Sequence, residues 1–352
     1  MRAKLIILIV ATVAVVAFGF AADRNDDERV DTEAVEAPLG GPPTSVAAPG
    51  TSSSPTIAAS ASTTGASTAS TVVESPDGKS TIFVTPTGAV TIVLAKEGTR
   101  YRVRTPCGGE ARLGSGKVYG ATTVVIDPGH GGFDPGASTA SGLTEADLNL
   151  DVAKKAKAIL DAMGYTTVLT READYYVPIQ IRAEIALAAS PKLFVSIHHN
   201  GGEAATRQGP GTEVYHQVQS APAKRLAGLM WEEIVNSFTQ NYNVTWRGAS
   251  DAGVIFRPDR DGRTDFFGVL RRTYPTIPSV LIEAGYMTNP QEATLMNRSD
   301  YRQNEAQALA NAVKRYLTTA DPGSGFKVPN NRGFETGTGG GGFDGCTEPK
   351  FS

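Results

Sequence analysis

The sequence predicts an α/β protein built on a twisted, mostly parallel sheet flanked by helices on both faces, with a small N-terminal β extension. Two observations predict this class. Between residues 122 and 319, short apolar runs typical of buried strands alternate with segments of helical periodicity. Strands that alternate with helices form parallel sheets, because each crossover helix packs on a face of the sheet. Before that region, residues 80–105 hold three β-rich runs separated by turn residues.

The first 23 residues have the pattern of an export segment. An apolar run at residues 5–22 follows Arg2 and Lys4, the charge arrangement of a segment inserted with its N-terminus in the cytoplasm. The length of the run fits either a signal peptide or a membrane anchor, since about 20 residues cross a bilayer. We therefore expect an extracytoplasmic protein, secreted or anchored to the cell membrane.

The next two segments differ in composition. Residues 24–75 are rich in Ala, Ser, Thr, Pro and Gly with few large apolar side chains, which predicts a disordered linker. Residues 76–120 contain the runs STIFV, AVTIVLA and TRYRVRT, which predict three strands. They form either a small β module or an extension of the main sheet.

The main domain is expected at residues 121–320. A helix is predicted at 146–163, where apolar residues recur at helical spacing and Thr144 with Asp147 resembles a capping box. A second helix start is predicted at Asn289-Pro290. The predicted strands are TTVVI (122–126), TTVLT (166–170), LFVSI (193–197), GTEVYH (211–216), FGVLR (267–271) and SVLIE (279–283).

Residues 321–352 are Gly-rich without periodicity, which predicts a poorly ordered tail. The two cysteines, Cys107 and Cys346, lie on either side of the main domain. Outside the cytoplasm they could form a disulfide that ties the tail down, and the alternative is two unrelated thiols.

The overall charge argues against nucleic acid as a partner. The formal net charge is −3, and the sequence holds no block of Lys and Arg that would gather phosphates.

Three of the four histidines follow predicted strands: His130 comes after TTVVIDPG, and His198 and His199 come after LFVSI. Because the carboxyl ends of parallel strands gather at one rim, we expect His130 and His198 to approach each other. His199 is either a residue that supports the site or an exposed one. His216 ends the GTEVYH strand, where it either contacts substrate or faces solvent, and solvent is favoured.

Glycines at 129, 131 and 132 flank His130, so the backbone can bend sharply and leave the imidazole uncrowded. The loop has neither the Walker spacing nor the G-x-G-x-x-G spacing, which argues against a nucleotide site. Asp127 and Asp134 either orient the imidazole or cap the loop, and capping is favoured.

Two glutamates complete a candidate catalytic set. Glu145 stands in the first turn of the predicted helix, where a carboxylate also has a simple role beside the helix N-terminus. Together with His130 and His198 it supplies the two imidazoles and one carboxylate of a catalytic zinc site, with a fourth position left for water. Glu283 follows the apolar SVLI run and is expected to face a cleft, where it could move protons.

Five motifs in order, DPGHGG, the glutamate of GLTEADLNL, LTR with the later Arg182-Ala183, SIHHN and SVLIEAGYMTNP, resemble those of zinc-dependent N-acetylmuramoyl-L-alanine amidases. The resemblance covers about residues 122–318. It implies zinc ligands at His130, Glu145 and His198 and a catalytic glutamate at Glu283. The implied reaction is hydrolysis of the amide between N-acetylmuramic acid and L-alanine in peptidoglycan. His199 stands where this family often has alanine.

Two other functions remain open from the sequence. A zinc peptidase could cut within the stem peptide, since the same metal centre serves both amides. A noncatalytic wall-binding protein could keep the fold, although all four candidate site residues are present. The absence of a G-x-S-x-G motif and of a cysteine near the histidines argues against a covalent nucleophile.

Overall fold

The computed structural model describes residues 72–201, 211–242, 253–327 and 341–352. The export segment expected at residues 1–23 and most of the expected linker lie outside these ranges. All described residues belong to one compact unit, Ala66–Ser352. Within the described ranges, no helix combines the length and the apolar character needed to cross a membrane.

The main sheet confirms the predicted α/β class. Its order within the described residues is β11-β10-β12-β9-β7-β8. Neighbouring strands run parallel except for β10 and β12, which are antiparallel. The strands are β7 (Val124–Pro128), β8 (Thr167–Leu169), β9 (Leu193–Asn200), β10 (Glu213–His216), β11 (Val254–Ile255) and β12 (Ser279–Tyr286).

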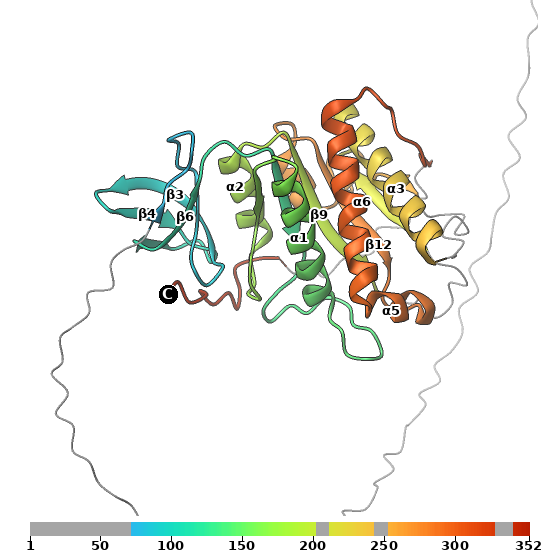
Figure 1. Ribbon diagram of the computed structural model, residues 1–352, viewed down its shortest axis with the longest axis horizontal. Coiled ribbons are helices and arrows are strands. Elements are labelled where there is room, and N and C mark those ends of the chain that lie inside the picture. Colours follow the sequence, from blue (N-terminus) through green and yellow to red (C-terminus); the bar gives the residue numbers. More distant parts are fainter. Residues whose placement is uncertain (1–71, 202–210, 243–252, 328–340) are drawn as a thin grey trace, which may run out of the picture. The chain divides into compact units, whose positions relative to one another are not determined.

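Helices cover both faces of this sheet because apolar residues occur at successive strand positions that point to opposite sides. Ile126 packs with the layer formed by α1 (Glu145–Ala162), α3 (Ala221–Tyr242) and α6 (Ser299–Thr318). In Figure 1 these three helices lie side by side in front of β9 and β12. Val125 instead packs with α2 and α4 on the other face. These two helices are α2 (Ile179–Ala189) and α4 (Gly268–Thr273), and α5 (Pro290–Met296) follows β12.

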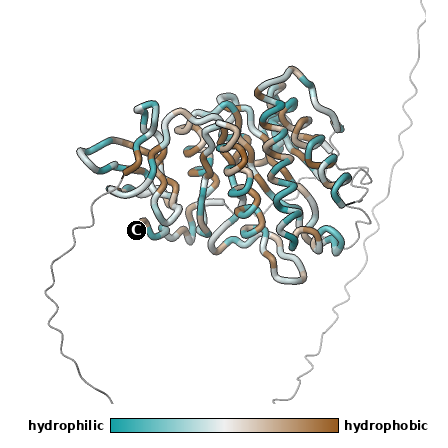
Figure 2. Tube along the Cα trace, in the orientation of Figure 1, coloured by the Kyte–Doolittle hydropathy of each residue, from teal (hydrophilic) through white to brown (hydrophobic). Residues whose placement is uncertain are grey.

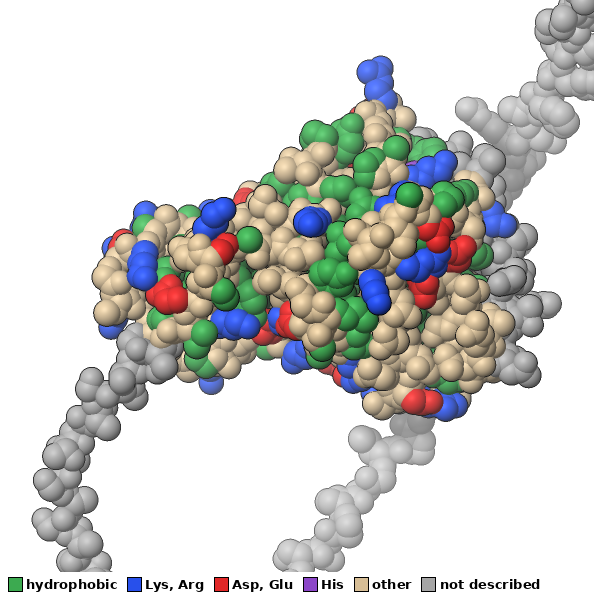
Figure 3. All heavy atoms as spheres, turned by 45° about the horizontal axis from the view of Figure 1, so that its top comes forward, with side chains coloured by type: hydrophobic (Ala, Val, Ile, Leu, Met, Phe, Trp, Pro, Cys, Tyr) green, Lys and Arg blue, Asp and Glu red, His purple; other side chains and the backbone are tan. Residues whose placement is uncertain are grey.

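The hydropathy pattern follows these layers. In Figure 2 the strands are hydrophobic along most of their length, whereas α6 alternates between hydrophilic and hydrophobic residues. Charged side chains of both signs are interspersed on the face shown in Figure 3, so that face carries no extended area of a single sign.

The N-terminal β extension is a separate sheet, with the order β1-β6-β2-β3-β4-β5 among the described residues. Phe83, Tyr101 and Val103 lie in its own small core, and Ile82 packs into the same cluster as Ile185 of α2. Three strands beyond the predicted ones are present, and β1 lies within the range expected to be linker. The strands are β1 (Val72–Val73), β2 (Ile82–Val84), β3 (Val90–Glu97), β4 (Arg100–Arg104), β5 (Glu110–Leu113) and β6 (Gly116–Tyr119).

One predicted strand is wrong. The run FGVLR at 267–271 contributes to helix α4, not to a strand. Its buried residues are Val269, Leu270 and Thr273, a spacing that places them on one side of a helix facing α2 and the sheet. Periodicity cannot separate a short strand from one buried helical turn in so short an apolar run.

Both predicted helix starts are confirmed. Thr144 caps α1, and its hydroxyl accepts a hydrogen bond from the Asp147 backbone N–H at 3.2 Å. Asn289 caps α5 by accepting from the two backbone N–H groups of the first turn, with Pro290 at its first position. These caps fix where each helix begins next to the site.

The last residues also differ from the expected poorly ordered tail. Gly341–Ser352 lie against the protein, and Cys346 forms a disulfide with Cys107. The alternative of two unrelated thiols is therefore wrong.

Candidate metal centre and active site

The loop after β7 holds His130 in an unusual backbone conformation. Its φ of 60° lies in the left-handed region, which costs a non-glycine residue about 1 kcal/mol or more. Two buried arginines bind the carbonyls around it. Arg171 donates to the carbonyls of Pro128 and Gly129, each at 3.0 Å, and Arg182 donates to that of His130 at 2.6 Å. These charge-assisted hydrogen bonds offset the strain and fix the direction of the imidazole.

Two glycines in this loop are required by the side chains packed against them. A Cβ on Gly129 would lie 2.2 Å from Cε1 of His198. A Cβ on Gly136 would lie 2.5 Å from Oε2 of Glu145 and 2.8 Å from Cδ2 of His130. The loop therefore closes directly around the three candidate ligands.

His130, Glu145 and His198 come together although they are distant in sequence. One ligand atom from each lies within 4.8 Å of the others. Oε1 of Glu145 is 3.1 Å from Nε2 of His130 and 3.0 Å from Nδ1 of His198. Two imidazole nitrogens and a carboxylate oxygen converging in this way are a donor set that suits a divalent metal ion.

The charges of the three groups suit a cation. Burial lowers the pKa of His130, but hydrogen bonds to Asp134 and Glu145 outweigh it and raise the pKa to about 10. Burial opposes ionisation of Glu145, yet its two histidine partners hold the pKa of this carboxyl well below its usual range. Burial lowers the pKa of His198 and so favours the neutral imidazole that ligates metals. Glu145 is thus ionised, and a bound cation would displace the proton of His130.

Glu145 is held from behind by backbone and by a buried polar network. Its carboxylate accepts hydrogen bonds from the backbone N–H groups of Ala137 at 2.9 Å and His199 at 3.1 Å. Asn149, one helical turn further on, lies 3.5 Å from Oε1 of Glu145 and 2.8 Å from Nδ1 of His199. Nε2 of His199 contacts Oε2 of Glu305 at 3.2 Å, and both side chains are fully buried. His199 is therefore a supporting residue and not an exposed one.

The two aspartates of the loop have different roles. Oδ2 of Asp134 lies 2.9 Å from Nδ1 of His130, so this carboxylate orients the imidazole, and Oδ1 accepts from the Gly136 N–H at 3.3 Å. Asp127 contacts neither imidazole nitrogen. It is buried beneath the site, where it accepts from Arg182 and from two hydroxyls. Asp134 therefore caps the loop, as favoured from the sequence, and it also orients His130.

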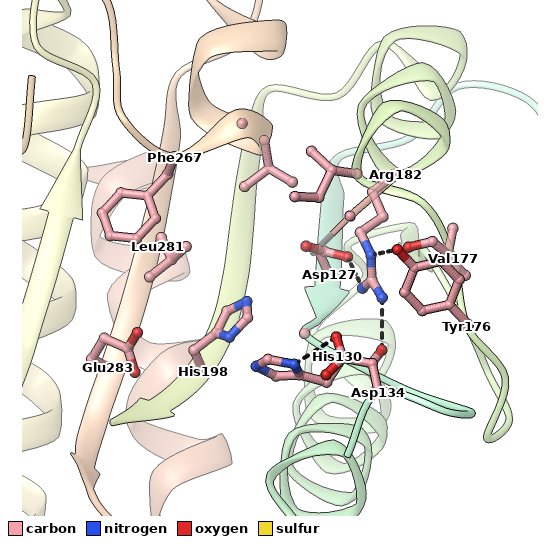
Figure 4. A pocket seen from close by; sticks show the side chains of 15 residues that line it. Asp127, His130, Asp134, Tyr176, Val177, Arg182, His198, Phe267, Leu281 and Glu283 are labelled. Atoms are coloured by element: carbon pink, nitrogen blue, oxygen red, sulfur yellow. Dashed lines mark hydrogen bonds and ion pairs between the residues drawn. The ribbon is translucent and has the colours of Figure 1, made fainter. Parts of the chain in front are cut away.

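Glu283 faces the same cleft from β12. Glu283 and His198 are register partners on neighbouring parallel strands, so their side chains project on the same side of the sheet. Both line a cleft of about 240 Å³ together with His130. In Figure 4 the carboxylate of Glu283 and the imidazole of His130 extend toward each other, with His198 between them. The structure therefore brings three of the four sequence-predicted site residues to the lining of one cleft, and the fourth, Glu145, contacts both of its histidines.

His216 does not face solvent as expected. It is 5% exposed, and its Nδ1 lies 2.8 Å from the carbonyl of Gln217. On the same strand, Glu213 is the register partner of Glu283 and accepts hydrogen bonds from the hydroxyls of Tyr215 and Tyr286. β10 thus contributes a buried polar layer beside the cleft.

Two imidazoles and a carboxylate beside a second carboxylate, presented by an α/β sheet, are the kind of donor set found in metal-dependent hydrolases. The family model described as N-acetylmuramoyl-L-alanine amidase matches residues 124–315, which is more than half of the chain. The chain belongs to this family.

Two curated relatives illustrate the similarity. The chain is 30% identical over 244 residues to N-acetylmuramoyl-L-alanine amidase AmiC of Neisseria meningitidis, covering 61% of this chain and 56% of the relative. It is 34% identical over 194 residues to N-acetylmuramoyl-L-alanine amidase LytC of Bacillus subtilis, covering 55% of this chain and 35% of the relative. The chain therefore spans about half and about a third of the lengths of these relatives. Among solved structures, N-acetylmuramoyl-L-alanine amidase AmiC2 of Nostoc punctiforme is 34% identical with a TM-score of 0.45, covering 56% of this chain and 97% of that one.

Sequence reasoning missed the residues that support the site. Arg171 and Arg182 lie in quoted motifs, but nothing in their spacing indicated that they bind the loop carbonyls. Glu305 could have been identified as a candidate, since it is an acidic residue beside the apolar face of α6. A buried charge on such a face usually has a partner, and His199 is that partner here.

Proposed function

We propose that the protein is a zinc-dependent amidase that hydrolyses the bond between N-acetylmuramic acid and L-alanine in peptidoglycan. The observation that carries the proposal is the convergence of His130, Glu145 and His198 within 4.8 Å, where both histidines line one cleft with Glu283. Family membership gives the substrate class. The cleft has room for the atoms around one amide, and the rest of the polymer would lie outside it.

Each residue has a defined role in this proposal. His130, Glu145 and His198 would hold the zinc, which when bound supplies a Lewis acid and makes water more acidic. Glu283 accepts the proton of the attacking water and passes it to the nitrogen of the leaving L-alanine. Asp134 keeps the imidazole of His130 in the direction needed for metal binding.

The lining of the cleft supports direct attack by water. Within the described residues, no serine, threonine or cysteine lines it. The hydroxyl of Tyr176, which does line it, donates to the carbonyl of Gly342 at 3.0 Å. This agrees with a hydrolase in which a carboxylate activates water.

We propose that the enzyme acts outside the cytoplasm at the cell wall. The disulfide between Cys107 and Cys346 supports this location, because such bonds persist in oxidising compartments. The division proposed from the sequence is an export segment or anchor at 1–23, a linker at 24–75, the β module at 76–120, the amidase domain at 121–320 and the tail at 321–352. One boundary differs, since the first strand of the module, β1 (Val72–Val73), lies within the proposed linker.

Digestion of purified peptidoglycan by the zinc-loaded protein tests the proposal. We expect release of stem peptides with a new L-alanine amine terminus, and loss of this release with a chelator. Glu283→Gln should lower the rate by about 10²–10⁴-fold with unchanged zinc content. Glu110→Gln, an exposed glutamate of the β module, is the matched control and should behave as the parent does.

Three results would contradict the proposal. Full activity of Glu283→Gln would show that Glu283 does not transfer the proton. New amine termini within the stem peptide would identify a peptidase. Binding to the wall without any cleavage that a chelator abolishes would identify a noncatalytic protein.

A further inference from the structure

We propose that the C-terminal segment Gly341–Ser352, here called the C-terminal strap, is a fixed wall of the cleft and determines how substrate binds there. The inference rests on the proposed amidase function and assigns part of its substrate recognition to a segment beyond the family match, which ends at residue 315. The strap reaches the cleft at one end and the β module at the other.

The first end of the strap is part of the cleft itself. Gly341 lines it on the same side as Tyr176 and Ile179. The carbonyl of Gly341 accepts a hydrogen bond from the Ile179 backbone N–H at 2.9 Å. Pro178, the residue before α2, provides no side-chain cap, so the strap carbonyl binds an N–H group that the helix leaves open. The hydroxyl of Tyr176 donates to the carbonyl of Gly342 at 3.0 Å.

This contact requires glycine at one position and not at the next. Gly341 has a φ of +146°, and a Cβ there would lie 2.4 Å from Cδ1 and 2.7 Å from Cγ1 of Ile179. A Cβ on Gly342 would meet nothing within 4 Å. The backbone of the strap therefore touches the cleft wall directly at Gly341, and a side chain there would push it away.

The other end of the strap is attached to the β module. Cys346 is bonded to Cys107, and the carboxylate of Glu348 accepts from the hydroxyl of Thr105 and from the Cys107 N–H at 3.3 Å. Phe351 packs against the small core of the module. Residues far from the metal centre in sequence thus hold the strap in place, which gives the β module a role in shaping the cleft.

The chemistry of this side of the cleft indicates what the strap would recognise. Tyr176 contributes an aromatic ring and Ile179 an aliphatic side chain, and Gly341 contributes backbone alone. An uncharged portion of the muropeptide beside the scissile amide fits such a surface, by shape and apolar contact. The strap holds none of the four candidate site residues, so its displacement should weaken binding more than chemistry.

Steady-state kinetics on soluble muropeptides test this inference, with Gly341→Ala, Gly342→Ala and the double variant Cys107→Ala/Cys346→Ala. We expect Gly341→Ala and the double variant to raise KM by about 5- to 20-fold with kcat within about twofold of the parent, the pattern of lost uniform binding. Gly342→Ala should keep the parent KM. Reducing agent should raise the KM of the parent but not that of the double variant.

Further readouts separate the possible outcomes. Zinc affinity, measured by competition with a chromogenic chelator, should be the same in all variants, since the ligands lie outside the strap. An unchanged KM in Gly341→Ala, a fall in kcat alone, or a rise in activity would overturn the inference. If the parent cleaves no muropeptide, the proposed function fails. In that case, calorimetry measures the affinity of the same muropeptide for the parent and for Gly341→Ala. Equal affinities would overturn the inference.

Discussion

The buried pair His199–Glu305 gives a prediction that can be worked from the structure. Both side chains are fully buried, Nε2 of His199 lies 3.2 Å from Oε2 of Glu305, and Asn149 contacts the other nitrogen at 2.8 Å. Removing the histidine leaves a buried carboxylate without that partner and opens a cavity. We expect His199→Ala to lower the free energy of unfolding by about 3–5 kcal/mol.

A double-mutant cycle isolates the contribution of the pair. Glu305→Leu keeps a similar volume and removes the carboxyl group, so we expect a smaller loss, about 1–2 kcal/mol. The double variant leaves no buried carboxyl group without its partner. Its loss in free energy of unfolding should therefore be smaller than the sum of the two single losses by about 2–3 kcal/mol. Urea denaturation with a chelator present measures these values, because bound metal would otherwise add its own stabilisation. Additivity within about 0.5 kcal/mol would refute the reasoning.

Three further predictions concern the loop and a second buried carboxyl. Gly136→Ala places a methyl group against Glu145 and should weaken zinc binding about tenfold or more. Gly142→Ala is the control, because Gly142 also has a positive φ but lies in open space, and its zinc affinity should be unchanged. Asp134→Asn should weaken zinc binding by about 10- to 100-fold in a chelator competition, and unchanged affinity would show that its contact with the imidazole is incidental. Burial raises the pKa of Glu292 to about 8. Between about pH 4.5 and about pH 8 the folded state therefore keeps a proton on this carboxyl that the unfolded state has released. The free energy of unfolding should fall as the pH rises through this range. Glu292→Gln should remove this fall and stabilise the protein at pH 7.5 by on the order of 2–4 kcal/mol; identical pH profiles of the melting temperature in parent and variant would contradict the assignment.

Much of the fold could be predicted because its signals are local. The capping residues Thr144 and Asn289 stand next to the helices they begin, and the apolar runs of β7, β9 and β12 are long enough to read as strands. Helix α4 could not be predicted, because its apolar run is too short to show whether the periodicity is helical or extended. The antiparallel direction of β10 depends on how the chain crosses the sheet, which no local pattern records.

The four site residues could be predicted for a similar reason. Residues at the carboxyl ends of parallel strands converge, so His130 and His198 could be placed at one rim from sequence alone. The support for the site could not be found in this way. Arg171 binds backbone carbonyls, which have no sequence signature, and Glu305 meets His199 from a helix more than 100 positions away.

The covalent link between Cys107 and Cys346 spans 239 positions and encloses the whole amidase sheet in a closed ring of chain. A single peptide bond cut by a protease inside that ring yields two fragments that remain one molecule, each carrying one half of the cystine. Such a nicked enzyme would migrate as an intact species under denaturing conditions until a thiol is added. Its candidate ligands, His130, Glu145 and His198, would all lie on fragments that cannot diffuse apart.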